Sequence, residues 1–229
     1  MATIYIIRHG QASFGEQNYD QLSPTGYLQS AQLGRHLNTL SIQIQEVVTG
    51  GMKRHLQTAE NSLSELLYEG SQTLDDLWNE YDHTSILAGY KPEYSDIEAI
   101  KKDIIHLPEP MKAFQKIFEE AILRWASGHF PEEYPESWED MVSRTVRGFE
   151  KIKNRIQPEQ AILVYTSAGT ISALLSNLLN LSLEDTFQLQ WSMPNCAVTT
   201  IRITDEKAEV SSVSDINFFK EHAELLTYR

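Results

Sequence analysis

The chain has almost no cysteine: Cys196 is the only one among its 229 residues. A single thiol excludes an intrachain disulfide and a zinc site built from several cysteines, and it fits a reducing compartment. Proline and glycine are also scarce, with 8 and 11 residues, which sets the chain apart from disordered and collagen-like sequences. We therefore expect a globular protein with a packed core.

Positive charge is in short supply as well. The 19 Lys and Arg residues face 32 Asp and Glu residues, which gives a formal net charge of −13. Such a chain has no surplus basic face for nucleic acid or an anionic membrane, so a few local cations must hold any anionic ligand. No apolar run reaches the roughly 18 residues of a membrane span, and the first residues lack the regions of a secretory signal. We expect a cytoplasmic protein that binds neither nucleic acid nor membrane.

Strand and helix patterns alternate along the sequence. Runs of β-branched and aromatic residues predict strands, and apolar residues at helical spacing predict helices between them. The predicted strands cover residues 3–8, 46–49, 161–166, 197–204 and 208–213, and the predicted helices cover residues 53–68, 137–156 and 168–180. This order predicts an α/β fold, a three-layer αβα sandwich with a mostly parallel sheet and an antiparallel edge pair.

Two local signals mark the ends of these elements. Ser23 is typical of an N-cap, with Pro24 at the first helical position after it. Four leucines of the helix that follows fall near one face: Leu28, Leu33, Leu37 and Leu40. The residues Asp205-Glu206-Lys207 are typical of a hairpin turn between the last two strands.

No repeat or linker divides the chain, so we expect one domain over residues 1–229. Five prolines between residues 92 and 135 break the regular pattern of residues 71–135. We expect an irregular, helix-rich excursion there, with about 82–131 as an insertion over the end of the sheet that carries the site.

Polar residues gather just beyond three predicted strands, where open α/β sheets bind ligands. The first strand ends in Arg8-His9-Gly10, Arg54 follows the second, and Ser167 follows the strand at 161–166. Guanidinium groups pair with phosphate oxygens, and neighbouring cations keep an imidazole neutral, as a nucleophile requires. This chemistry needs no metal, and the sequence has neither a P-loop nor a Gly-x-Gly-x-x-Gly motif. We therefore expect phosphoryl transfer without a cofactor.

These residues resemble the histidine phosphatase superfamily, which includes the cofactor-dependent phosphoglycerate mutases. The similarity extends over most of the chain outside residues 82–131. It includes Arg8-His9-Gly10-Gln11, Leu22-Ser23-Pro24-Thr25-Gly26 with Gln29, Arg54 with Gln57-Thr58-Ala59-Glu60, residues 77–80, Glu136-Ser137-Trp138, Asn195, Asn217 and His222.

The resemblance implies a role for each site residue. His9 matches the nucleophile that becomes phosphohistidine, Arg8 and Arg54 match the phosphate-binding arginines, and Glu80 matches the acid that protonates the leaving alkoxide. Ser167 departs from the family pattern, because relatives usually have a second histidine there.

The two departures from the family pattern affect the expected activity. The Ser167 hydroxyl donates a hydrogen bond but carries no positive charge, so the resemblance implies a slower enzyme that Ser167→His accelerates. Gly15 stands where many relatives have an asparagine, which leaves one phosphate contact open.

Each assignment has an alternative. His9 is otherwise a turn residue, and Arg54 a solvated residue at a helix N-terminus. Glu80 otherwise belongs to a solvated acidic face, with Asp82 as the acid. Ser167 is otherwise the N-cap of the next helix, or the nucleophile of a serine hydrolase. In the hydrolase alternative, Asp205 or Asp215 and His222 are the partners of Ser167. The histidines other than His9 are otherwise expected to be surface or structural residues: His36, His55, His83, His106, His129 and His222.

The sequence thus predicts a phosphatase that hydrolyses a small phosphorylated molecule through phospho-His9. A phosphoglycerate mutase is the second hypothesis, although residues 82–135 show no basic cluster to hold a second charged group. A phospholigand-binding module of little or no activity is the third, and the serine hydrolase is the fourth. The oligomeric state is left open.

Overall fold

The computed structural model describes residues 1–13, 20–204 and 207–228. Its contacts divide the chain into two compact units. The first unit combines Met1–Glu80 with Thr145–Arg229 and carries the sheet, and the second unit, Tyr81–Arg144, is built from helices. The chain returns to the first unit within one helix, α6 (Trp138–Lys153).

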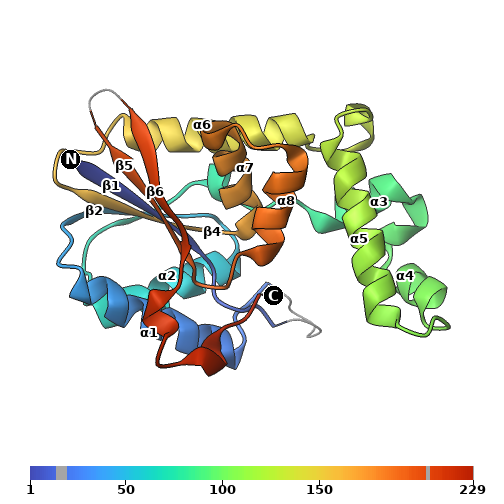
Figure 1. Ribbon diagram of the computed structural model, residues 1–229, viewed down its shortest axis with the longest axis horizontal. Coiled ribbons are helices and arrows are strands. Elements are labelled where there is room, and N and C mark those ends of the chain that lie inside the picture. Colours follow the sequence, from blue (N-terminus) through green and yellow to red (C-terminus); the bar gives the residue numbers. More distant parts are fainter. Residues whose placement is uncertain (14–19, 205–206, 229) are drawn as a thin grey trace. The chain divides into compact units, whose positions relative to one another are not determined.

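Among the described residues, the first unit holds a six-stranded sheet with the order β3-β2-β4-β1-β5-β6 (Figure 1). Its strands are β1 (Ala2–Arg8), β2 (Ile44–Thr49), β3 (Gln72–Leu74), β4 (Ala161–Thr166), β5 (Val198–Ile203) and β6 (Ala208–Asp215). The pairs β1–β4, β2–β4 and β2–β3 are parallel, whereas β5 is antiparallel to both β1 and β6. The predicted mostly parallel sheet with an antiparallel edge pair is confirmed.

Helices cover both faces of this sheet, because its central strands are apolar on both sides. On β4, Ile162 and Val164 belong to one core cluster, and Leu163 and Tyr165 belong to the other. The first cluster includes side chains of α6, α7 and α8, and the second includes side chains of α1 and α2 (Figure 1). These helices are α1 (Pro24–Thr39), α2 (Lys53–Leu66), α7 (Ala168–Leu179) and α8 (Leu183–Ser192). The predicted three-layer sandwich is confirmed.

Helix α1 begins as predicted, but only half of its predicted apolar face is buried. Ser23 is the N-cap, and its hydroxyl accepts a hydrogen bond from the Gly26 N–H at 3.1 Å. Leu33 and Leu37 are fully buried, whereas Leu28 is 57% exposed. Leu28 precedes Leu33 by five residues, which places it about 140° away around the helix. Leu40 lies at the C-cap and is also exposed, so the prediction was wrong for both residues.

One strand and one α-helix of the first unit were not predicted, nor were its short 3-10 helices at Asp76–Trp78, Asn217–Phe219 and Ala223–Leu225. Strand β3 pairs with β2 inside the stretch expected to be irregular, and its three residues are all exposed, so it shows no apolar alternation. Helix α8 begins after Ser182, whose hydroxyl accepts from the Asp185 N–H at 3.1 Å. The predicted hairpin residues Asp205 and Glu206 lie outside the described residues.

The second unit contains α3 (His83–Tyr90), α4 (Ile97–Ile104), α5 (Pro110–Ala126) and short 3-10 helices at Pro92–Ser95 and Pro131–Glu133. Three of its prolines stand at the start of a helix, where the missing N–H leaves no hydrogen bond unmade. These prolines therefore begin helices rather than separate irregular pieces. The ring of Trp125 packs against Tyr81 and Trp138, with centroid distances of 5.0 and 5.4 Å.

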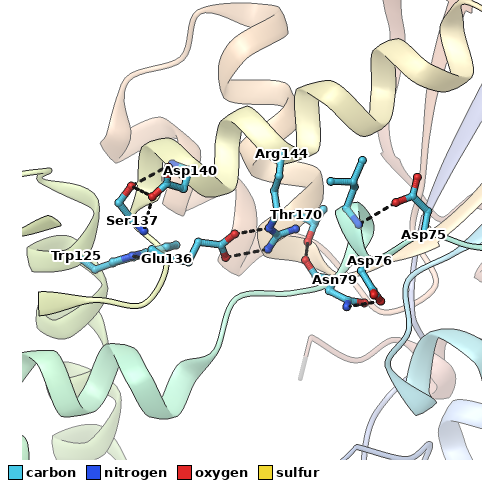
Figure 2. Close-up of polar contacts among 10 residues, drawn as sticks. Asp75, Asp76, Asn79, Trp125, Glu136, Ser137, Asp140, Arg144 and Thr170 are labelled. Carbon is cyan, nitrogen blue, oxygen red and sulfur yellow. Dashed lines mark hydrogen bonds and ion pairs between the residues drawn. The ribbon is translucent and has the colours of Figure 1, made fainter. Parts of the chain in front are cut away.

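Polar contacts fix the beginning of α6 within the second unit (Figure 2). Arg144 forms a forked ion pair with Glu136, in which Nη2 donates to Oε2 at 3.0 Å and Nε donates to Oε1. The Asp140 N–H donates to Ser137 Oγ at 3.1 Å, and the Ser137 N–H donates to Asp140 Oδ2 at 3.2 Å, which is a reciprocal helix cap. Within the described ranges, every helix is too short or too polar to span a lipid bilayer.

Candidate active site

The register of the sheet brings the ends of three strands to one edge. Arg8 is opposite Thr166 in the β1–β4 pair, and Thr49 is opposite Tyr165 in the β2–β4 pair. The pairing continues one residue further, since the His9 N–H donates to the Thr166 carbonyl at 2.9 Å. His9 and Ser167, which follow β1 and β4, therefore lie near each other.

His9 is buried, with 7% of its surface exposed, and its ring is fixed by the backbone. Its Nδ1 lies 2.7 Å from the carbonyl oxygen of Gly10, which accepts a hydrogen bond but donates none. Nδ1 therefore carries the proton, and Nε2 keeps its lone pair. Burial holds the pKa of His9 well below its usual value, and the charges of Arg54 and Arg8 lower the pKa further. The imidazole is thus neutral and suited to nucleophilic attack.

The turn after His9 requires a glycine. A Cβ on Gly10 would lie 2.7 Å from the carbonyl oxygen of Gly26 in α1. The Gly10 N–H donates to Thr58 Oγ1 in α2 at 3.0 Å. Because α1 and α2 both contact this turn, they fix the backbone that carries the imidazole.

Both arginines expected at the site are buried, with exposed fractions of 8% for Arg8 and 4% for Arg54. The Arg8 guanidinium donates to the carbonyl oxygens of Met193 and, at 3.3 Å, Tyr228. Arg54 lies in the first turn of α2, and its Nη1 donates to Asp20 Oδ1 at 2.9 Å. The charges of Arg54 and Arg8 both lower the pKa of His9.

Ser167 occupies the N-cap position of α7, but its side chain makes no capping hydrogen bond. Its Oγ lies 2.6 Å from Nε2 of His55 instead, and both side chains are buried. The ring of His55 also lies near that of His9, with a centroid distance of 5.7 Å. Burial and the charge of Arg54 hold the pKa of His55 well below its usual value.

His55 was not predicted at the site, because the sequence pattern placed it among the surface or structural histidines. Two signals point to it. His55 directly follows Arg54 in the first turn of α2, and Gly50 at the end of β2 leaves room for its ring. A Cβ on residue 50 would collide with Nδ1 of His55.

Glu80 lies beside the start of α7. Its Oε2 accepts a hydrogen bond from the Gly169 N–H at 3.0 Å. The preceding residue, Asn79, anchors the segment: its side-chain oxygen accepts from the Gly51 N–H at 2.6 Å. Its carbonyl oxygen accepts from Thr170 Oγ1 at 2.9 Å (Figure 2). Contacts to Gly51, which follows β2, and to the first turn of α7 therefore hold the segment that carries Glu80.

Asp82, the alternative acid, caps helix α3 in the second unit. Its Oδ1 accepts from the Thr84 N–H at 2.9 Å. Burial works to raise the pKa of Asp82, but hydrogen bonds from Ser85 and Thr84 outweigh it and the pKa is lowered. A carboxyl group that holds its charge so well is a poor proton donor.

Residues near the C-terminus contact the same region, which the sequence analysis did not predict. Gln29 accepts from the Gln11 N–H at 2.7 Å and donates to the Leu225 carbonyl at 2.6 Å and to Thr227 Oγ1 at 2.7 Å. Thr227 Oγ1 in turn donates to Asn195 Oδ1 at 2.9 Å. Gln29 and Asn195, two positions of the family resemblance, thus tie this segment to the His9 loop.

The proposed partners of a Ser167 nucleophile are engaged elsewhere. His222 pairs with Glu224 at 3.4 Å, and Asp215 accepts from Asn217 at 2.7 Å. Asp205 and Gly15 lie outside the described residues. The imidazole that contacts Ser167 is therefore His55, not His222. The described residues contain no group of three or more side chains of the kinds that hold a metal ion.

The chain is similar to proteins of one family. The family model described as the histidine phosphatase superfamily (branch 1) matches residues 4–99 and 105–216. No curated protein matches the sequence significantly.

Several solved structures share the fold. A phosphoglycerate mutase from Bacillus anthracis str. Sterne is 20% identical with a TM-score of 0.65, over 95% of this chain and 94% of that one. A mycobacterial glucosyl-3-phosphoglycerate phosphatase is 17% identical with a TM-score of 0.64, over 93% and 99% of the two chains. A phosphoserine phosphatase from Entamoeba histolytica is 13% identical with a TM-score of 0.62, over 94% and 98%.

Proposed function

This chain belongs to the histidine phosphatase superfamily, branch 1, and we propose that it is a metal-independent phosphomonoester hydrolase that acts on a small phosphorylated metabolite through a phosphohistidine formed at His9. The observation that carries the proposal is the state of His9. Its ring is buried and neutral, its Nδ1 donates to the Gly10 carbonyl and so leaves the lone pair of Nε2 free, and the charges of Arg54 and Arg8 lower its pKa further. That combination is what a nucleophile for phosphoryl transfer requires.

In the first step, the lone pair of His9 Nε2 attacks phosphorus, and the bond from phosphorus to the leaving oxygen breaks. Glu80, as the carboxylic acid, gives its proton to that oxygen, so an alcohol leaves. Arg8 and Arg54 neutralise the charge on the transferred group, and Ser167 donates a hydrogen bond to one of its oxygens.

In the second step, water attacks the phosphohistidine. Glu80, now a carboxylate, takes a proton from the water as the new P–O bond forms and the P–N bond breaks. Inorganic phosphate is released, and His9 and Glu80 return to their starting states. No metal takes part in either step.

The charges of the second unit favour a phosphatase over a phosphoglycerate mutase. A mutase must hold a second anionic group, which calls for cations beyond those at the phosphoryl site. The basic residues of this unit are largely paired with its own carboxylates: Lys91 with Asp103, Lys101 with Glu98, Lys112 with Glu109, Lys116 with Glu120, Arg124 with Glu133 and Arg144 with Glu136. We therefore expect no interconversion of phosphoglycerates.

The contact between Ser167 and His55 also raises the serine hydrolase hypothesis. A hydrolase of that kind orients its histidine with a third group and binds the oxyanion with backbone N–H groups. Nδ1 of His55 has no hydrogen-bond partner among the described residues, and the Gly169 N–H is occupied by Glu80. These contacts favour phosphoryl transfer, and we expect no labelling of Ser167 by a fluorophosphonate.

Hydrolysis of p-nitrophenyl phosphate in the presence of a chelator tests the proposal. We expect slow turnover that His9→Ala abolishes. His36→Ala is the matched control, because His36 is half-buried on α1 and stacks on Phe218, with a centroid distance of 4.8 Å. Activity that survives in His9→Ala rejects the mechanism. Phosphate binding without any turnover in the wild type identifies a binding module instead.

A further inference from the structure

His55 is a buried imidazole that the proposed reaction does not use. None of its surface is exposed, and Nε2 contacts Ser167 Oγ at 2.6 Å. Its other nitrogen, Nδ1, has no hydrogen-bond partner among the described residues. Burial of a polar ring costs free energy unless its polar atoms are hydrogen-bonded, and within the described part of the chain Nδ1 is not, so the ring calls for a functional explanation.

The surroundings of the ring fix its direction. Nδ1 faces Gly50 at the end of β2, where a side chain would leave no room for it. Nε2 therefore faces the end of β4, where Ser167 begins α7. The ring spans the edge of the sheet beside the nucleophile, with its centroid 5.7 Å from that of His9.

The position of the proton on His55 decides whether the Ser167 hydroxyl accepts a hydrogen bond from Nε2 or donates one to it. With the proton on Nδ1, a buried N–H would face Gly50 without an acceptor, and orphaned buried N–H groups are rare in proteins. With the proton on Nε2, the ring donates to Ser167 Oγ. The hydroxyl hydrogen of Ser167 is then free to donate to another acceptor.

We infer that His55 is a positioning residue, which donates from Nε2 to Ser167 Oγ and so directs the Ser167 hydroxyl hydrogen at an oxygen of the phosphoryl group. The two side chains act as one donor in place of the imidazole that relatives carry at the position of Ser167. A chain of two hydrogen bonds polarises along its length, so the pair is a stronger donor than an isolated serine. This inference rests on the proposed function.

A double-mutant cycle on aryl phosphate hydrolysis tests the coupling. We expect Ser167→Ala to lower kcat/KM about 10²-fold and His55→Leu to lower it about 10-fold or more. We expect the double variant to be no slower than Ser167→Ala, because His55 acts only through the hydroxyl. Losses that multiply in the double variant overturn the inference.

Rescue by a conservative variant separates positioning from packing. The side-chain amide of Gln places an N–H close to the position of Nε2, so we expect His55→Gln to retain kcat/KM within about 3-fold while His55→Leu does not. Equal losses in the two variants mean that only the shape of the ring matters and overturn the inference. Thermal unfolding of each variant shows that the comparison is made between folded proteins.

Two measurements decide the inference even if the proposed function fails. Nitrogen-15 NMR of the imidazole rings gives the tautomer of His55, and we expect the proton on Nε2 with a shift of its signal in Ser167→Ala. A proton on Nδ1 overturns the inference. Calorimetry with vanadate gives the affinity for a phosphoryl analogue, which we expect His55→Leu to weaken and His55→Gln to preserve. If the wild type shows no turnover that depends on His9, by contrast, only the proposed function is rejected.

Discussion

Nδ1 of His9 donates to the carbonyl oxygen of Gly10 across 2.7 Å, which leaves Nε2 as the only ring nitrogen with a free lone pair. The proposed mechanism therefore places the phosphoryl group on Nε2. We expect phosphorus-31 NMR of the enzyme, after brief exposure to an aryl phosphate, to show the Nε2-linked isomer. The signal is absent in His9→Ala. An Nδ1-linked phosphohistidine would contradict the hydrogen bond to Gly10.

The low pKa of His9 predicts how its ring titrates. Burial makes the largest contribution, and the charges of Arg54 and Arg8 add to it. Removing a nearby cation favours the imidazolium, so Arg54→Gln raises the pKa of His9 toward its usual value of 6.5. Titration of the labelled ring by NMR measures the change. Arg35→Gln is the control, since Arg35 is exposed and pairs with Glu65. A wild-type pKa at or above 6.5 would contradict the burial of the ring.

The stability of the protein depends on pH through His55 as well. Its pKa is lower in the folded state than the usual 6.5, so the unfolded chain binds more protons as the pH falls below that value. The free energy of unfolding then decreases with falling pH, by at most about 1.4 kcal/mol per pH unit for one histidine. Urea denaturation at several pH values gives the free energy of unfolding as a function of pH. We expect this function to have a smaller slope in His55→Gln than in the wild type. Equal slopes would mean that His55 titrates normally in the folded protein.

Much of the fold was predictable because local patterns and tertiary packing agree in the central strands. Strand β4 is apolar throughout and buried on both faces, so its limits were predicted to the residue. Strand β3 was not predicted, because its exposed residues join the sheet only through backbone pairing with β2. Helix α8 was missed although Ser182 and Asp185 form a recognisable cap.

The site was predictable where it follows from strand ends and unpredictable where it depends on packing. Arg8 ends β1, and His9 and Ser167 directly follow β1 and β4, whose C-terminal ends the sequence pattern predicted. His55 is different, because its role depends on the absence of a side chain at Gly50 and on the direction of its ring. The spacing of residues along the sequence carries neither fact.

The loss of kcat on removing Glu80 should depend on the leaving group of the substrate. We expect a larger loss for a substrate with a poorer leaving group. Glu80→Gln removes the proton donor, so we expect it to lower kcat on an alkyl phosphate by about 10²- to 10⁴-fold. A nitrophenolate leaves without protonation, so the same variant should release p-nitrophenol in a burst equivalent to one turnover and then stall at the phosphohistidine. Rapid-mixing absorbance measurements detect the burst.

Asp82→Asn is the control for this experiment, because asparagine still caps α3. We expect it to leave both substrates unaffected. A loss of activity in Asp82→Asn with none in Glu80→Gln would assign the acid to Asp82.

Ser167→His tests whether the second imidazole of this site comes from position 55. The family pattern alone predicts that this substitution accelerates the enzyme. In the structure, Ser167 is 1% exposed and its Oγ lies 2.6 Å from Nε2 of His55, so a second ring at position 167 has no room. Overpacking of this kind costs about 1–3 kcal/mol and displaces neighbouring side chains.

We therefore expect Ser167→His alone to lower both the melting temperature and the turnover of p-nitrophenyl phosphate. The combination with His55→Ala removes one ring as it adds another, so it nearly conserves volume and places an imidazole at position 167, as the family resemblance predicts. We expect the double variant to recover at least about 10-fold in kcat over Ser167→His, since a donor to the phosphoryl group is restored. A single variant that is faster than the wild type and as stable would show that His55 and an imidazole at 167 fit side by side, and the structural argument for exchanging one for the other would fail.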